Sequence, residues 1–103
     1  MNYTDLKIKS LENRHNITIL LFLADNEPSI KTDIYSAIST NPRMPEKLNE
    51  LDRAGLIIQK TDRFENNRTT VTLTDKGRLV AHFLKEIENE LNTNHELIID
   101  HIH

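Results

Sequence analysis

The chain has no cysteine and no tryptophan, and it has only two glycines and three prolines among its 103 residues. Without cysteine there is no disulfide, no thiolate zinc site and no cysteine nucleophile, a composition that fits the reducing cytoplasm. So little glycine and proline argues against a loop-rich sandwich or a disordered linker and favours helices. The longest apolar run, residues 17–24, is too short to cross a bilayer, and the first ten residues lack the apolar core of a signal peptide. We therefore expect a cytoplasmic protein with no membrane partner.

Charge is distributed unevenly along the chain, although the total is only −3. Residues 41–78 hold eight basic and six acidic side chains, whereas residues 79–103 hold one lysine and five acidic side chains. A chain of this length forms one domain, because it has no room for two independent cores. We therefore expect one polarised domain with a mildly basic middle segment and an acidic C-terminal end.

Apolar periodicity and turn signals predict four helices and three short strands. In chain order these are a buried helix over 12–24, a short strand at 29–30, a helix over 31–38, a helix from 45 to Gly55, strands over 56–60 and 69–73, and a helix that begins at Asp75. Pro28 ends the first helix because the residue before a proline avoids helical angles. Gly55 supplies a C-terminal stop, and Thr74 supplies an N-terminal cap.

This order of elements predicts an α+β, mostly helical fold in which three helices pack against a small antiparallel sheet, a winged helix-turn-helix with a long C-terminal helix. Three segments follow from it. Residues 1–11 are an N-terminal arm or short helix, residues 12–78 form the winged helix-turn-helix, and residues 79–103 form a C-terminal dimerisation helix.

The dimerisation helix is predicted from a heptad seam, in which apolar residues recur at alternating steps of four and three. The seam residues are Val80, Leu84, Ile87, Leu91, Asn94 and Ile98. Leu79 and Phe83 flank the seam on the side that could pack back on the domain. Because so small a domain has little chain to cover this seam, we expect a homodimer. In the alternative, the helix ends near Asn92, where three poor helix formers follow one another.

Two motifs resemble those of bacterial and archaeal winged-helix transcriptional regulators. The segment Leu48-x-x-Leu51-x-x-x-Gly55-Leu56-Ile57 is similar to the end of their recognition helix, and Leu73-Thr74-Asp75-Lys76-Gly77 is similar to the junction after their second wing strand. The resemblance covers about residues 12–90. It is closest to the MarR-like and HxlR-like groups and to small archaeal proteins that dimerise by a coiled coil. It implies a sequence-specific regulator that binds double-stranded DNA, with no effector identified.

In a helix-turn-helix the second helix lies in the major groove, and basic residues on a wing can bind phosphates or enter the minor groove. The predicted DNA-contacting residues are Lys31, Thr32, Thr40, Asn41, Arg43, Glu46, Asn49, Arg53, Lys60, Arg63, Asn66, Asn67 and Arg68. Asn49 is suited to a bidentate contact with adenine. Phe64 at the end of the wing either meets a partner or folds onto the strands, and Arg63 could instead pair with Asp62 or Glu65.

Other functions have weaker support in the sequence. The acidic total and the glutamates on the recognition helix leave open a winged-helix module that binds protein and not DNA, and a non-specific architectural DNA binder would be more basic. His82, His95, His101 and His103 lack the spacing of a metal site. No glycine-rich phosphate loop or nucleophile motif is present, so we expect neither an enzyme nor a cofactor.

Overall fold

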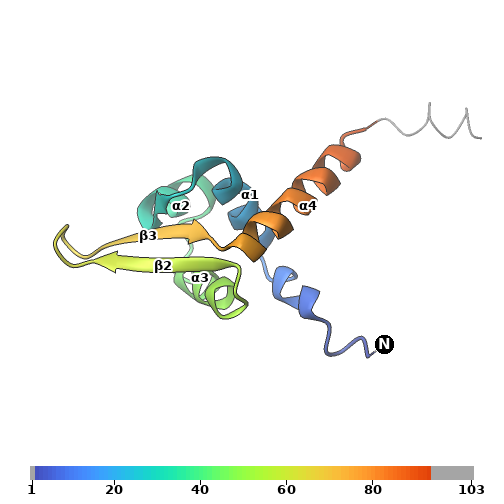
Figure 1. The fold of residues 1–103 in the computed structure, drawn as a ribbon, viewed down its shortest axis with the longest axis horizontal. Coiled ribbons are helices and arrows are strands. Elements are labelled where there is room, and N and C mark those ends of the chain that lie inside the picture. Colours follow the sequence, from blue (N-terminus) through green and yellow to red (C-terminus); the bar gives the residue numbers. More distant parts are fainter. Residues whose placement is uncertain (1, 94–103) are drawn as a thin grey trace, which may run out of the picture.

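The computed structural model describes residues 2–93. Figure 1 shows its helices gathered around the base of a long β-hairpin that projects beyond them. The elements are the 3-10 helix η1 (Lys7–Leu11), α1 (Asn16–Asn26), β1 (Ser29–Ile30), α2 (Lys31–Ile38), α3 (Met44–Arg53), β2 (Ile57–Asp62), β3 (Arg68–Leu73) and α4 (Asp75–Leu91).

The three strands form one antiparallel sheet in the order β1-β3-β2. β1 adds only Ser29 and Ile30 to the sheet, opposite Val71 and Thr70. β2 and β3 stay paired over their whole length, from Ile57 opposite Leu73 to Asp62 opposite Arg68. This arrangement confirms the predicted α+β, mostly helical winged helix-turn-helix, with α2 and α3 as the helix pair and β2–β3 as the wing.

The core lies where α1 is enclosed by the other helices and the base of the sheet. It consists of Ile19, Leu20, Leu23, Ile34, Met44, Leu48, Leu51, Leu56, Ile57, Val71, Leu73, Ala81 and Leu84. The apolar residues of α3 recur at 44, 48 and 51, which places them on one face of the helix and leaves the opposite face in solvent. No helix within residues 2–93 is both long and apolar enough to cross a membrane.

Two segments far apart in sequence meet where the wing joins α4. The Thr74 N–H donates to the carbonyl oxygen of Leu56 over 3.0 Å, and the Thr74 hydroxyl donates to that of Gly55 over 2.6 Å. The same hydroxyl oxygen accepts from the Gly77 N–H, as an N-cap does. Gly55 has a φ of 77°, which turns the chain out of α3. Hydrogen bonds therefore join the two motifs on which the family resemblance rests.

Several boundaries differ from the sequence prediction. α1 begins at Asn16 and not at residue 12, because His15 has a left-handed φ of 74° that interrupts a helix. The buried Asn16 side chain then donates to the carbonyl oxygen of Ser10, which holds the incoming chain against the start of α1. β2 extends to Asp62 because its pairing with β3 continues to that residue.

The predictions for the last helix need correction. α4 ends at Leu91, where the Asn92 side chain donates to the Glu88 carbonyl oxygen, so the helix ends where the alternative placed it. Leu84, predicted for the dimer seam, is buried in its own chain's core, whereas Leu79 and Phe83, which flank the seam on the side that could pack back on the domain, are exposed. α4 instead turns its Ala81 side toward α1. Asn94 and Ile98 lie outside the described residues.

Candidate nucleic-acid interface

The outer face of α3 carries the predicted recognition residues. Arg43 occupies the N-cap position, and Glu46, Asn49 and Arg53 follow along the helix, all of them exposed. Opposite them, Met44, Leu48 and Leu51 are buried. The face therefore presents cationic, anionic and amide groups together, which are the groups that can read base edges in a major groove.

The recognition helix is joined to the wing through a side chain that the sequence analysis did not single out. The Nε2 of Gln59 on β2 donates to Asn49 Oδ1 over 3.0 Å and to Asp52 Oδ2 over 3.2 Å. This contact fixes the Asn49 amide, with its oxygen toward β2. Oδ1 is already an acceptor here, so the NH₂ group is the part of the Asn49 side chain best placed to bond a base.

A second acidic side chain of α3 is directed away from the outer face. Glu50 Oε2 accepts from Asn13 Nδ2 over 2.8 Å and from Asn16 Nδ2 over 3.3 Å. Asn16 is the first residue of α1 and Asn13 lies shortly before it, so Glu50 joins α3 to the start of α1 and is half-buried. Of the two glutamates that argued for a protein partner, Glu46 alone therefore stands on the exposed face.

A small basic pocket lies beside the first turn of α3. It has a volume of about 220 Å³. Its lining consists of Arg14, His15, Asn41, Arg43, Met44 and Lys47. The lining holds three cationic side chains and no acidic one. Arg14 precedes α1 in sequence, and only tertiary packing brings it next to α3, so no sequence signal pointed to this pocket.

The remaining predicted residues of the helix-turn-helix are spread along α2 and the turn. Lys31 and Thr32 occupy the first turn of α2, and Thr40 is exposed in the connection to α3. Asn41 uses Oδ1 to accept from the Arg43 N–H over 2.8 Å, so its side chain shapes the turn. These residues lie along the start of α2 and the start of α3, where a DNA backbone would pass a helix-turn-helix.

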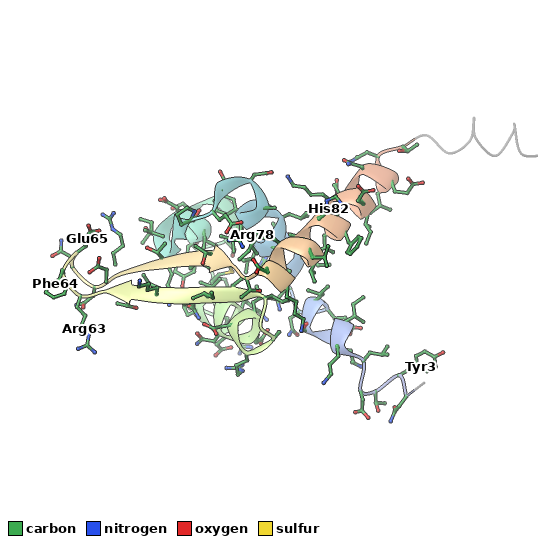
Figure 2. The ribbon with its side chains drawn as sticks, in the orientation of Figure 1. Tyr3, Arg63, Phe64, Glu65, Arg78 and His82 are labelled. Carbon is green, nitrogen blue, oxygen red and sulfur yellow. The ribbon has the colours of Figure 1, made fainter. Side chains whose placement is uncertain are left out.

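The wing carries the other predicted contacts on exposed side chains. These are Lys60, Arg63, Asn66, Asn67 and Arg68. Asn66 and Asn67 each adopt a φ of 57°, the left-handed conformation that asparagine tolerates in tight turns. Within the described part of the chain Arg63 forms no ion pair with Asp62 or Glu65. Figure 2 shows Arg63 and Glu65 projecting to different sides of the hairpin end, with Phe64 between them.

An apolar groove of about 950 Å³ lies between η1 and α4, and its lining extends to Arg53 at the end of α3. Its lining includes Ile8, Leu11, Val80, Phe83 and Ile87. Phe83 and Ile87 keep 56% and 55% of their surface exposed, although both are large apolar residues. The groove is therefore an uncovered apolar surface, which is rare unless a partner or ligand occupies it.

Two side chains with a raised pKa, Tyr35 and Arg78, line neither the basic pocket nor the apolar groove. Burial raises the pKa of Tyr35 on α2, and the hydrogen bonds that Arg78 donates to the Glu27 carboxylate raise the pKa of Arg78. Within residues 2–93, no three His, Asp or Glu side chains are grouped in a way that could hold a metal ion. His82 Nε2 lies 3.7 Å from Glu86 Oε1 on the same helix. The other three candidate histidines lie outside the described residues.

No protein-family model and no curated protein matches the sequence, but solved structures match the fold. A MarR-family transcriptional regulator from Porphyromonas gingivalis W83 is 20% identical with a TM-score of 0.73, and the match covers 84% of this chain and 86% of that one. An HxlR-family factor from Thermoplasma volcanium GSS1 is 19% identical with a TM-score of 0.73, covering 89% and 84%. MepR of S. aureus, in complex with DNA, is 21% identical with a TM-score of 0.69, covering 94% and 82%. At such identities the similarity establishes the winged-helix fold.

Proposed function

We propose that this chain is a transcriptional regulator that binds double-stranded DNA as a homodimer and recognises a specific sequence. Residues 12–78 are the DNA-binding part, with α3 in the major groove and the wing along the adjacent backbone. The activity is binding and not catalysis.

The observation that carries this proposal is the joining of α3 and the wing into one polar surface. The contact of Gln59 with Asn49 and Asp52 fixes the outer face of α3 relative to β2. Preorganised side chains lose little conformational freedom on binding, and this improves both affinity and selectivity. The fold similarity to MepR in complex with DNA supports the same mode of binding.

The basic pocket beside α3 supplies a position for the DNA backbone. Arg14, Arg43 and Lys47 surround it, and its lining contains no acidic side chain. Phosphate contacts fix the register of a protein on the duplex, whereas base contacts carry the sequence information. We assign the pocket the first role and the exposed face of α3 the second.

The dimer part of the proposal rests on α4 and η1. Leu79, Phe83, Ile87 and Leu91 recur every four residues along α4, and all of them are exposed. Ile8 of η1 is also exposed and lines the same groove as Phe83 and Ile87. A second copy of the chain would cover this surface and would place two recognition helices on two half-sites.

The proposal is tested by fluorescence anisotropy of a labelled pool of random duplex DNA at rising salt concentration. The double variant Arg63→Ala/Arg68→Ala removes two exposed wing cations. The control variant, Lys85→Ala, removes a cation of α4 that contacts Asp25 and lines neither the groove nor the basic pocket. We expect binding at low salt, with a log–log slope that the wing variant makes shallower by about 0.9 for each lost phosphate contact. The control should keep the wild-type slope.

Two results would contradict the proposal. Absence of binding to the pool and to any selected duplex at low salt would favour the protein-binding alternative. In that case the exposed Glu46 would contact a protein partner. An equal loss of slope per removed cation in the wing variant and in the Lys85→Ala control would mean that the charge contacts are non-specific.

A further inference from the structure

Phe64 is the least explained side chain in the described chain. Its surface is 100% exposed, and it lies at the outer end of the wing, as Figure 2 shows. Every residue from 61 to 68 is exposed, so the ring has no apolar neighbour at the hairpin end and contributes no burial to folding. Exposing a phenylalanine side chain to water is unfavourable relative to burying it. A bound partner is the natural place for the ring.

The hairpin end holds this ring in a defined position. Asp62 Oδ1 accepts from the Phe64 N–H over 2.9 Å, and the Glu65 carbonyl oxygen accepts from the Arg68 N–H over 3.1 Å. The left-handed backbone of Asn66 and Asn67 then closes the turn. The backbone around Phe64 is thus ordered by its own hydrogen bonds, and the ring points outward without support from the rest of the domain.

The surroundings of the ring favour nucleic acid over protein. Protein docking sites use contiguous apolar patches, whereas Phe64 is a single apolar side chain among polar ones. Lys60, Arg63 and Arg68 supply three cations near it, against the acidic Asp62 and Glu65. An apolar wedge flanked by cations is the combination that minor-groove proteins use, in which the cations hold phosphates while the wedge separates two base pairs.

We propose that Phe64 inserts between two base pairs in the minor groove beside the site read by α3, and that it kinks the duplex there. This inference rests on the proposed DNA binding and adds a role for one residue. The kink makes recognition depend on how easily the contacted base step unstacks, so flexible pyrimidine–purine steps are preferred at that position.

The test uses a duplex selected by the wild-type protein from the random pool. Adenines next to the α3 half-site are replaced one at a time by 2-aminopurine, whose fluorescence rises on unstacking, and the ends carry a donor and an acceptor dye that report bending. Three variants are compared with wild type, namely Phe64→Ala, Phe64→Leu and Arg63→Ala. Thermal melts should be the same for all four proteins, since neither Phe64 nor Arg63 packs on the domain.

We expect wild type to raise the 2-aminopurine signal at one step and to shorten the end-to-end distance. Phe64→Ala should lose both effects while its affinity falls by no more than about tenfold, because phosphate contacts dominate binding. Phe64→Leu should retain most of both effects, since leucine also serves as a wedge. Arg63→Ala should weaken binding and keep the kink.

The outcomes separate this inference from the proposed function. If wild type binds the selected duplex and Phe64→Ala unstacks and bends it equally, the wedge is wrong and DNA binding stands. If wild type binds no duplex, both proposals fail, and Phe64 belongs to a protein interface.

Discussion

Glu27 and Arg78 form a two-point ion pair across 51 positions of sequence. Arg78 Nη2 lies 2.9 Å from Glu27 Oε1, and Arg78 Nε lies 3.0 Å from Glu27 Oε2. Glu27 Oε1 also accepts from the Leu73 N–H over 3.2 Å. One carboxylate therefore connects the end of α1, the end of β3 and the first turn of α4, and the bond to it raises the pKa of Arg78.

Glu27→Ala should lower the midpoint of thermal unfolding by about 4–8 °C, because losing hydrogen bonds to a half-buried carboxylate costs on the order of 1 kcal/mol. Asp75→Ala is the matched control, since it removes the exposed carboxylate that contacts Arg78 at 3.0 Å and leaves the Glu27 contacts in place. Differential scanning calorimetry measures both. Equal shifts in the two variants would show that the link between α1 and β3 contributes nothing.

Gly77→Ala should destabilise the protein, although glycine to alanine in a helix is normally stabilising. A Cβ at residue 77 would overlap the carbonyl oxygen of Leu56, which is itself held by Thr74. We expect a loss of about 1–3 kcal/mol in urea unfolding, the usual cost of overpacking. At Gly55 the problem is the backbone and not space, so Gly55→Asn should cost less than Gly55→Ala. A neutral Gly77→Ala would contradict the contact.

Tyr35 should make stability fall in alkaline solution. Burial raises its pKa above the ordinary value of 10.0, so the folded state holds the phenolic proton more tightly than the unfolded state does. Its contribution is complete below pH 10 and is lost as the pH rises through the folded pKa. Tyr35→Phe should therefore lose less stability than wild type between pH 9 and 11, as measured by urea unfolding. A Tyr35→Phe variant that loses stability as steeply as wild type would contradict this prediction.

Phe83→Glu should convert a dimer to a monomer, because a carboxylate covered by a second copy of the chain would lose its hydration. Asn89→Glu is the matched control, since it adds the same charge to the same helix beside Lys85, away from the groove. Sedimentation equilibrium measures the mass of each protein. A monomeric wild type, or a dimer that survives Phe83→Glu, would contradict the proposed interface.

Asn49→Asp should weaken binding to the selected duplex more than Asn49→Ala does. The amide oxygen of Asn49 faces Gln59, so DNA meets the NH₂ donor, and aspartate replaces that donor with a second acceptor and a negative charge. We expect a loss of about tenfold or more, as for one base contact of 1–3 kcal/mol. Competition with duplexes altered at single positions measures it. Equal effects of the two substitutions would contradict a donating role.

Local sequence determined most of the fold. The β1 and α2 ranges, the stop at Gly55 and the cap at Thr74 were all predicted, because each depends on residues a few positions apart. The exposed face of α3 was predicted for the same reason, since helical periodicity alone separates it from Leu48 and Leu51.

Tertiary packing decided the rest, because it sets neighbours that sequence spacing does not encode. A heptad pattern on α4 could not show that Leu84 is buried in the core while Phe83 is exposed, since both positions fit an apolar stripe. The basic pocket depends on Arg14 reaching α3, and the orientation of Asn49 depends on Gln59 across the start of the wing. Periodicity thus determined which face of each element is buried and which is exposed. The packing of the elements against one another decided which side chains are in contact.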